Sequence, residues 1–256
     1  MKKILNTFLD QFPTTDILRK FFFNQDSFFE HNNLGFMKLN FLKKFLYEAE
    51  ILLSKTTTLS PFGNLVKKLG WSSSTTWSLI LVNLVFNNPQ FRWYVENLPL
   101  NEFINRKIVE AKLKNIGLSY NSANAITKTF RRICSTPLGT VANFGRTQSD
   151  GFGKVWLKRT TPKLSDGRIM LYALYKFAVD GEGQYQFNLS KLYNSHSTAI
   201  NPTNIFSVDS DEMQQILNGL STNFPELIST SFTHDLEKIS LKPNKYPHDI
   251  LKIFYL

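Results

Sequence analysis

The chain has 256 residues, of which 42% are hydrophobic, and a formal net charge of +10. Its length allows one large domain or two or three small ones, and this hydrophobic content excludes a disordered chain. The single cysteine, Cys134, excludes internal disulfides and any zinc or iron–sulfur site built from thiolates, as expected in a reducing cytoplasm. The most apolar segment, Trp77–Phe86, is far shorter than the roughly 20 residues that span a bilayer, so we expect a cytoplasmic protein without a membrane segment.

Residues 1–71 are expected to form a helical N-terminal region. Apolar spacing predicts helices over Ile4–Phe12, Thr15–Phe23 and Met37–Leu53. Asp10 interrupts the first apolar run, which therefore predicts an ordinary helix and not a secretion signal. The aromatic cluster within Phe21–Phe29 has two interpretations, a filled core or an exposed patch for a partner.

Most of the net charge lies in one stretch of the chain. Residues 101–168 hold thirteen Lys and Arg against four Asp and Glu, which amounts to +9 of the total +10. Charge confined to one module is the electrostatic footprint expected of a nucleic-acid contact. We therefore consider residues 72–162 as one basic domain.

The first half of this domain is predicted to supply a buried helix, an aromatic helix and a strand. Trp77–Asn87 is apolar on all sides and must be buried. Pro89–Pro99 makes a short aromatic helix, and Glu102–Ile104 supplies a small first strand. Asn105 then caps a helix that ends at Gly117.

The second half predicts a basic helix followed by a hairpin. Apolar residues recur at helical spacing from Ala123 to Ile133 and give the helix one buried face. Pro137 ends this helix, and two β-prone runs follow, Thr140–Thr147 and Phe152–Thr160, joined by a turn at Asp150-Gly151. Helix, turn, basic helix and basic hairpin in this order resemble a winged helix-turn-helix, whose second helix enters the major groove of DNA.

The predicted DNA-contacting residues lie on the basic helix and on the hairpin. Lys and Arg side chains would neutralise phosphates, while an Asn or Arg of the helix would reach a base edge. These residues are Asn124, Lys128, Arg131, Arg132, Arg146, Lys154, Lys158 and Arg159. The alternatives are that the basic helix is only a solvated face, or that the module docks a protein.

Residues 163–256 are predicted to form a second, near-neutral winged-helix-like unit. Its elements are a helix behind Asp166, a strand at Gln184–Leu189, a helical turn at Pro202–Phe206, a helix over Asp209–Leu220, and a hairpin of Ile228–Phe232 with Leu236–Leu241. The acidic start of the 209–220 helix suits the positive end of a helix dipole but would repel phosphate. We expect this unit to pack or dock. The predicted fold class is mainly α with small β hairpins, an α+β fold.

No catalytic or metal-binding motif stands out, and no cofactor is expected. Phosphate-cradling glycine loops are absent from the sequence, and its histidines lack metal-ligand spacing. His234-Asp235 with Glu237 has two interpretations, a nuclease centre or the turn of a hairpin. Cys134 would need a base to act as a nucleophile, although Arg131 and Arg132 could lower its pKa.

Five segments carry a resemblance to known families: Trp77–Leu84, Asn88–Tyr94, Thr136–Gly139, Arg159–Pro162 and Leu171–Phe177. They resemble the C-terminal region of large bacterial PAPS-reductase-like proteins from phage-defence islands, which include DNA phosphorothioation and BREX-type systems. The chain is also similar to the Ssp-type B family of unknown-function domains encoded beside such reductases, to which DNA binding and nicking are ascribed. This resemblance spans about residues 60–255.

The resemblance implies a DNA-engaging accessory subunit. The chain lacks the ATP-pyrophosphatase (PP) loop and the cluster cysteines of the fused proteins, so sulfur-transfer chemistry would reside in a PP-loop, PAPS-reductase-like partner. Three hypotheses follow: a non-catalytic subunit that binds double-stranded DNA, a DNA nickase of the same system, and a structural subunit that docks the reductase-like partner.

Overall fold

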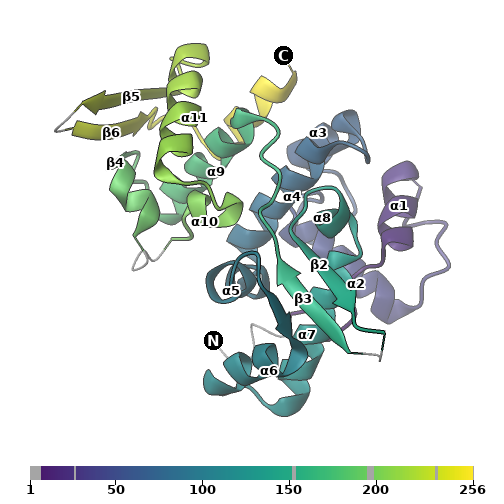
Figure 1. Cartoon of the computed structure of the whole chain (residues 1–256). Helices are drawn as coiled ribbons and strands as arrows, with labels where there is room; N and C mark the ends of the chain where they lie inside the picture. Colours follow the sequence, from purple (N-terminus) through teal and green to yellow (C-terminus); the bar gives the residue numbers. More distant parts are fainter. Residues whose placement is uncertain (1–6, 26, 152–153, 195–198, 234–235, 256) are drawn as a thin grey trace. The chain divides into compact units, whose positions relative to one another are not determined.

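The computed structural model describes residues 7–25, 27–151, 154–194, 199–233 and 236–255 (Figure 1). The chain divides into two compact units, Met1–Lys163 and Leu164–Leu256. Helices predominate in the described ranges, together with two small three-stranded antiparallel sheets. The predicted α+β fold class with mainly helical content is confirmed.

Five helices lead the described part of the first unit, and the fourth of them is central. They are α1 (Thr15–Phe23), α2 (Phe36–Glu48), α3 (Pro61–Leu69), α4 (Ser74–Asn87) and α5 (Pro89–Asn97). Every residue of α4 from Thr76 to Val85 is buried, and the helix packs against α2, α3 and α5. The Ser73 hydroxyl accepts a hydrogen bond from the Thr76 amide and caps α4. An all-round apolar helix is thus the core of this unit, as its sequence predicts.

The N-terminal segment differs from its predicted helix. Residues 7–12 form a turn, and residues 4–6 lie outside the described residues. Leu9 and Asp10 have left-handed φ angles of 43° and 62°, which a helix does not allow. Phe8 and Phe12 are buried with their ring centroids 4.9 Å apart. Their spacing of four residues imitates a helix, but the two rings instead anchor a turn on the core.

Two other element boundaries in the structure differ from the predicted ones. The helix predicted to reach Leu53 ends at Glu48, because Glu50 turns the chain with a φ of 59° and Leu52 pairs with Leu59. The strand predicted from Thr140 begins only at Gly145, because Pro137 starts a short helix there instead of a strand.

The basic part of the first unit follows the predicted order. Its elements are β1 (Phe103–Asn105), α6 (Arg106–Asn115), α7 (Tyr120–Cys134), α8 (Pro137–Thr140), β2 (Gly145–Ser149) and β3 (Val155–Arg159). The strands form an antiparallel sheet in the order β1-β3-β2. Ile104 and Leu157 lie opposite each other on its buried face, while α7 contacts β2.

Aromatic side chains fill the core between α5, α7 and the sheet. The Tyr94 ring lies 4.6 Å from that of Phe130, and Phe144 stacks on Phe91 at 5.9 Å. The buried Tyr94 hydroxyl donates to the Ile126 carbonyl at 2.8 Å, so α5 and α7 are joined by a satisfied polar contact.

The second unit repeats this order of elements. It contains α9 (Gly167–Asp180), β4 (Gln186–Asn188), η1 (Leu189–Tyr193), α10 (Pro202–Phe206), α11 (Ser210–Asn223), β5 (Ile228–Thr233), β6 (Leu236–Leu241), α12 (Pro247–Ile250) and η2 (Leu251–Tyr255). Its sheet has the order β4-β6-β5, in which the first strand again pairs with the last. A helix, a strand, three helical segments and a hairpin thus recur in both units, and His234 and Asp235 of the second hairpin lie outside the described residues.

Candidate nucleic-acid interface

Helix α7 carries three of the predicted DNA-contacting cations, Lys128, Arg131 and Arg132. The Ser119 hydroxyl caps it by accepting from the Ser122 amide at 3.2 Å, and Ala123, Ile126 and Phe130 lie on its buried face. Arg131 and Arg132 occupy its last turn, where the helix dipole favours positive charge. Both side chains are partly exposed.

The hairpin contributes a second set of cations. In the register of the sheet, Arg146 lies opposite Lys158, and Phe103 flanks Lys158 from the other side. The Lys158 ammonium sits 5.2 Å from the centre of the Phe103 ring, a cation–π contact that holds this side chain on the outer face. Lys154 precedes β3 and is exposed. The outer face of the sheet is therefore cationic.

Five of the predicted cations have no carboxylate partner in the described part of the chain: Arg131, Arg132, Arg146, Lys154 and Lys158. Lys128 is an exception, because its ammonium lies 3.6 Å from the Asp10 carboxylate. A partly exposed pair of this kind contributes only about 0–1 kcal/mol, so a phosphate can replace Asp10 as its partner.

The N-terminal segment borders one side of α7. Besides the Lys128–Asp10 pair, the Thr15 hydroxyl donates to the Ser135 carbonyl at 2.8 Å. Residues 10–15 therefore run beside the second half of α7, which places the N-terminal helices in the same compact unit as the basic module. The side of α7 that carries Arg131 instead faces the hairpin, because Arg131 and Lys154 line one pocket.

Arg159 does not belong to the exposed set. Only 7% of its surface is accessible, its guanidinium is 3.5 Å from the Leu98 carbonyl, and burial lowers its pKa to about 10. Alternation along β3 explains this position, because Leu157 and Arg159 point inward whereas Trp156 and Lys158 are partly exposed. Arg159 remains cationic at neutral pH, but its place in the predicted DNA-contacting set is not supported by its burial.

Asn124 lies one helical turn before Lys128 and is partly exposed. Its side-chain oxygen is buried and has no hydrogen-bond partner among the residues that the structure describes. The predicted role of Asn124 in reading a base edge stays a prediction.

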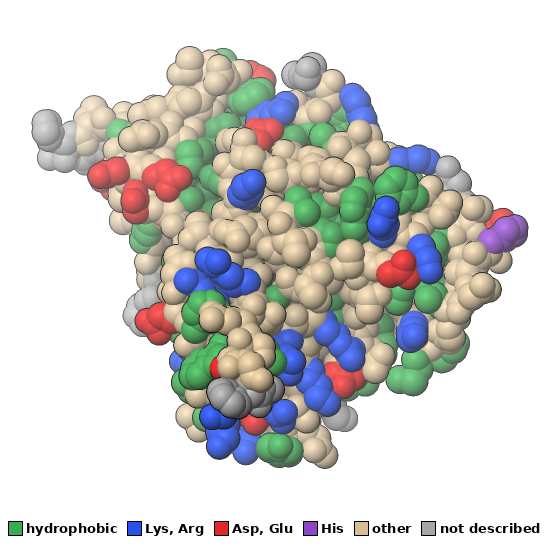
Figure 2. Space-filling model, turned by 45° about the vertical axis from the view of Figure 1, so that its right-hand side comes forward, with side chains coloured by type: hydrophobic (Ala, Val, Ile, Leu, Met, Phe, Trp, Pro, Cys, Tyr) green, Lys and Arg blue, Asp and Glu red, His purple; other side chains and the backbone are tan. Residues whose placement is uncertain are grey.

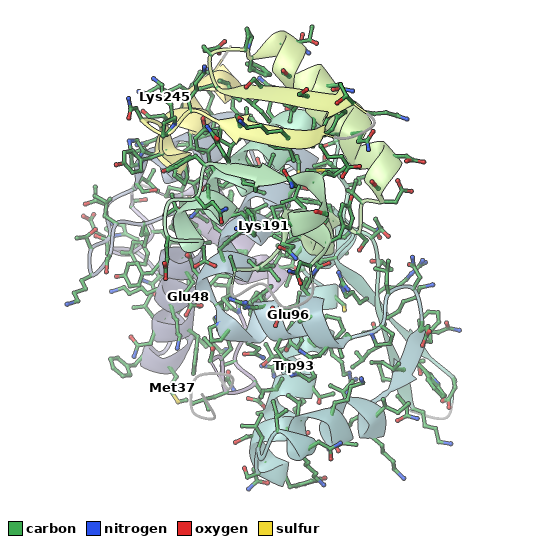
Figure 3. All side chains as sticks on the ribbon, turned by 90° about the vertical axis from the view of Figure 1, so that its left-hand side faces the viewer. Met37, Glu48, Trp93, Glu96, Lys191 and Lys245 are labelled. Carbon is green, nitrogen blue, oxygen red and sulfur yellow. The ribbon has the colours of Figure 1, made fainter. Side chains whose placement is uncertain are left out.

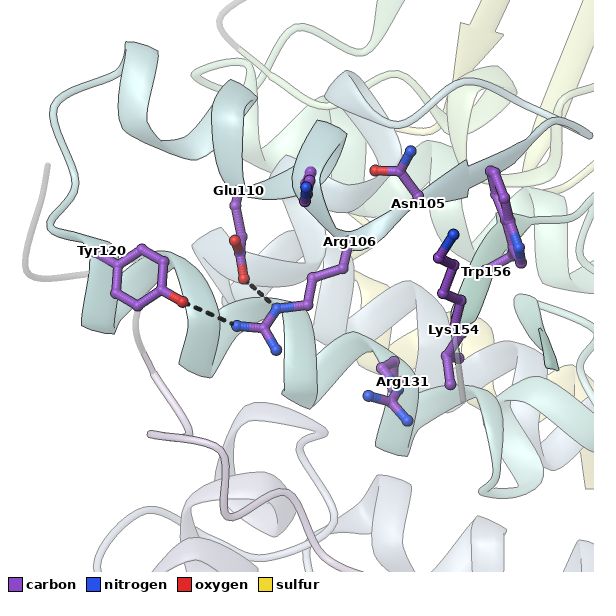
Figure 4. A pocket seen from close by; sticks show the side chains of 9 residues that line it. Asn105, Arg106, Glu110, Tyr120, Arg131, Lys154 and Trp156 are labelled. Atoms are coloured by element: carbon purple, nitrogen blue, oxygen red, sulfur yellow. Dashed lines mark hydrogen bonds and ion pairs between the residues drawn. The ribbon is translucent and has the colours of Figure 1, made fainter. Parts of the chain in front are cut away.

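A pocket of about 550 Å³ opens between α6, α7 and the start of β3 (Figure 4). Its polar lining includes Asn105, Arg106, Lys107, Glu110, Arg131 and Lys154, and its aromatic lining is Tyr120 and Trp156. Four basic side chains face one acidic side chain there. The sequence reasoning did not single out this pocket, although its first-turn cations follow directly after the cap that Asn105 was predicted to form.

An internal network holds one wall of this pocket. Arg106 donates from Nε to the Glu110 carboxylate and from a terminal nitrogen to the Tyr120 hydroxyl at 3.4 Å. The hydrogen bond to Glu110 raises the pKa of Arg106 above its usual value. Arg106 and Glu110 thus neutralise each other, whereas Lys107, Arg131 and Lys154 have no carboxylate partner among the described residues.

The molecular surface shows where Lys and Arg side chains lie on one face. Lys and Arg side chains cluster in the lower part of Figure 2, at the height where Figure 1 places α6, α7 and the hairpin of the first unit. This clustering is the arrangement that a polyanion requires.

The residues considered for catalysis do not form a reactive site among the described residues. Cys134 is 6% exposed, and burial raises its pKa to about 12, so Arg131 and Arg132 do not activate it. His234 and Asp235 lie outside the described residues. Elsewhere in the described ranges, no three His, Cys, Asp or Glu side chains gather as metal ligands would.

The Phe-rich N-terminal region is divided between core and surface. Phe21 is fully buried, while Phe23 is 66% exposed. Phe36 and Met37, at the start of α2, are also exposed, and Figure 3 shows Met37 pointing away from its helix. Neither of the two interpretations of this cluster therefore holds for all of its members. No helix in the described ranges has the length and apolar character of a membrane span.

No protein-family model matches this chain, and no curated protein sequence matches it. Among solved structures, the chain is similar to the magnesium ion-bound SspB crystal structure, with a TM-score of 0.64 and 11% sequence identity. The match covers 98% of this chain and 83% of that chain. At this identity the likeness shows a shared fold. It agrees with the Ssp-type resemblance, whereas no family match supports the resemblance to PAPS-reductase-like proteins.

Proposed function

We propose that this chain is a DNA-binding accessory subunit of a bacterial DNA modification or anti-phage defence system of the phosphorothioation type. The proposal rests on one observation above all: Arg131, Arg132, Arg146 and Lys154, from one helix end and one hairpin, have no carboxylate partner in the described part of the chain. Cations left unpaired on adjoining elements repel each other, and a polyphosphate relieves that repulsion.

The order of elements supports duplex DNA as the polyanion. Strand β1, helices α6 and α7 and the β2–β3 hairpin, with the first strand paired to the last, have the order of a winged helix, and the short helix α8 connects α7 to the hairpin. Because residues 10–15 border the Lys128 side of α7, the duplex would lie across the hairpin and the Arg131 side. The likeness to SspB favours the same system, and a PP-loop, PAPS-reductase-like partner would supply the sulfur chemistry that this chain lacks.

The second unit is proposed to dock that partner. Helix α11 starts with Asp211 and Glu212 in its first turn behind the Asp209 cap. Phosphate would be repelled there, whereas a basic protein surface would be attracted. The nickase alternative would need a set of carboxylates, and no observation on the described residues favours it.

Binding of a fluorescein-labelled 20-base-pair duplex, followed by fluorescence anisotropy, tests the proposal. Charge reversal by Arg131→Glu with Arg132→Glu is expected to abolish binding at moderate salt. Lys67→Glu with Lys68→Glu is the matched control, because these two exposed cations also occupy the last turn of a helix of the first unit. Equal binding by both variants would refute the assigned surface.

A further inference from the structure

The pocket beside α7 combines two kinds of lining that together point to a class of ligand. Lys107 in α6, Arg131 in α7 and Lys154 just before β3 supply positive charge. Trp156 and Tyr120 supply aromatic surface, and Tyr120 is 54% exposed. A phosphate ester needs the first kind of lining and a nucleobase needs the second.

The aromatic residues of the pocket are available to a ligand. Tyr120 contacts Arg106 through its hydroxyl, and the Lys114 ammonium lies 4.8 Å from the centre of its ring. Trp156 is partly exposed and makes no aromatic ring contact with another described residue. In Figure 4, Trp156 and Lys154 lie at one end of the pocket, Tyr120 lies at the other, and Arg106 is between them.

The pocket is also continuous with the proposed DNA surface. Trp156 and Lys158 lie on the same face of β3, and Arg146 lies opposite Lys158. A backbone that follows Arg146 and Lys158 therefore passes the mouth of the pocket. The volume of about 550 Å³ is within the range of small-molecule sites and is enough for one nucleotide.

We infer that this pocket receives one unpaired nucleotide of the bound DNA, with its phosphate held by Arg131 and Lys154 and its base against Trp156. The inference rests on the proposed function, because it assumes that DNA lies on the adjoining surface. It goes beyond that function by naming an unstacked nucleotide, and not an intact base pair, as the preferred ligand. A base that is already unpaired escapes the cost of unstacking, which gives the pocket a basis for selection.

The test compares three DNAs with the full chain by fluorescence anisotropy. They are a perfect 20-base-pair duplex, the same duplex with one bulged adenine, and the same duplex with a bulged abasic residue. Stacking of a base on an aromatic side chain predicts that the bulged adenine binds roughly 5- to 150-fold tighter than the perfect duplex. The abasic bulge bends the duplex similarly but has no base, so it is expected to bind like the perfect duplex.

Variants assign the preference to the pocket. Trp156→Ala is expected to remove the preference and to change the affinity for the perfect duplex by less than about twofold, whereas Trp156→Phe keeps most of the preference. Tyr120→Ala is expected to lower the preference for the bulged adenine in part. Because Tyr120 is exposed, this variant keeps the inference testable if Trp156→Ala fails to fold. Phe23→Ala removes an exposed aromatic side chain outside the pocket and is expected to have no effect.

The outcomes separate this inference from the proposed function. Equal affinity of the wild-type chain for all three DNAs overturns the pocket and leaves duplex binding in place. Equal affinity for the adenine and abasic bulges also overturns it, because the pocket would then hold only phosphate. The variant Arg132→Glu with Arg146→Glu is expected to lower the affinity for all three DNAs by the same factor and so to preserve the ratios between these affinities. If the wild-type chain binds none of the three DNAs, the proposed function itself is overturned.

Discussion

Salt dependence offers a quantitative test of how many cations meet the DNA. Six predicted cations lie at the surface: Lys128, Arg131, Arg132, Arg146, Lys154 and Lys158. Each phosphate contact on B-DNA contributes about −0.9 to the slope of log affinity against log salt concentration. If all six make contact, the slope is about −5.4. Replacement of Arg131 and Arg132 by alanine is expected to reduce it to about −3.6.

These slopes correspond to easily measured changes in affinity. Between 50 and 200 mM salt, a slope of about −5.4 lowers the affinity roughly 2000-fold, whereas a slope of about −3.6 lowers it roughly 150-fold. Anisotropy titrations at four salt concentrations resolve the difference. The Lys67→Ala, Lys68→Ala variant removes the same charge from a matched helix end and is expected to keep the wild-type slope. A wild-type slope shallower than about −2, or equal slopes for the two variants, would refute the reasoning.

Three further predictions concern the first unit. Burial raises the pKa of Glu48 from 4.5 to about 6, so between these pH values the folded state keeps a proton that the unfolded chain releases, and the free energy of unfolding falls as pH rises from about 4.5 to 6. In urea titrations, Glu48→Gln should therefore raise the free energy of unfolding by about 1–2 kcal/mol at pH 8 and by little at pH 4. In Gly139→Ala, the new Cβ would lie 2.2 Å from the Cys134 carbonyl oxygen, so we expect a loss of about 2–3 kcal/mol, whereas Gly219→Ala, with open space in α11, should be neutral or stabilising. At pH 8, the raised pKa of Cys134 should slow its reaction with a disulfide reagent roughly a thousandfold relative to the denatured chain, and fast native-state reaction would contradict its burial.

Local patterns were enough to predict most helices and the site's elements. Trp77–Asn87 lacks a polar face and therefore had to be buried, whatever its neighbours are. Asn105 and Asp209 cap α6 and α11 because a side-chain oxygen satisfies amides only a few residues away. The concentration of charge between residues 101 and 168 was likewise a property of the chain alone.

Contacts between distant residues decided the remaining features. Phe8 and Phe12 carried a helical spacing, yet their packing into the core produced a turn. Arg159 belongs to a basic run, but its side chain lies on the inward face of β3 with Leu157 and is buried. The alternation along β3 places Arg159 on the same face as Leu157 and so predicts burial, whereas the charge of an arginine predicts exposure.

The sequence by itself determined that this chain folds into helix-rich units and where along it the positive charge accumulates. Only the tertiary structure decided which cations remain unpaired, because the Lys128–Asp10 pair joins residues far apart in the chain. It also brought Arg131, Lys154 and Trp156 to one pocket from α7 and the hairpin. The physical reason is range: capping and periodicity act over a few residues, whereas ion pairing and pocket formation depend on side chains that meet only after the chain has folded.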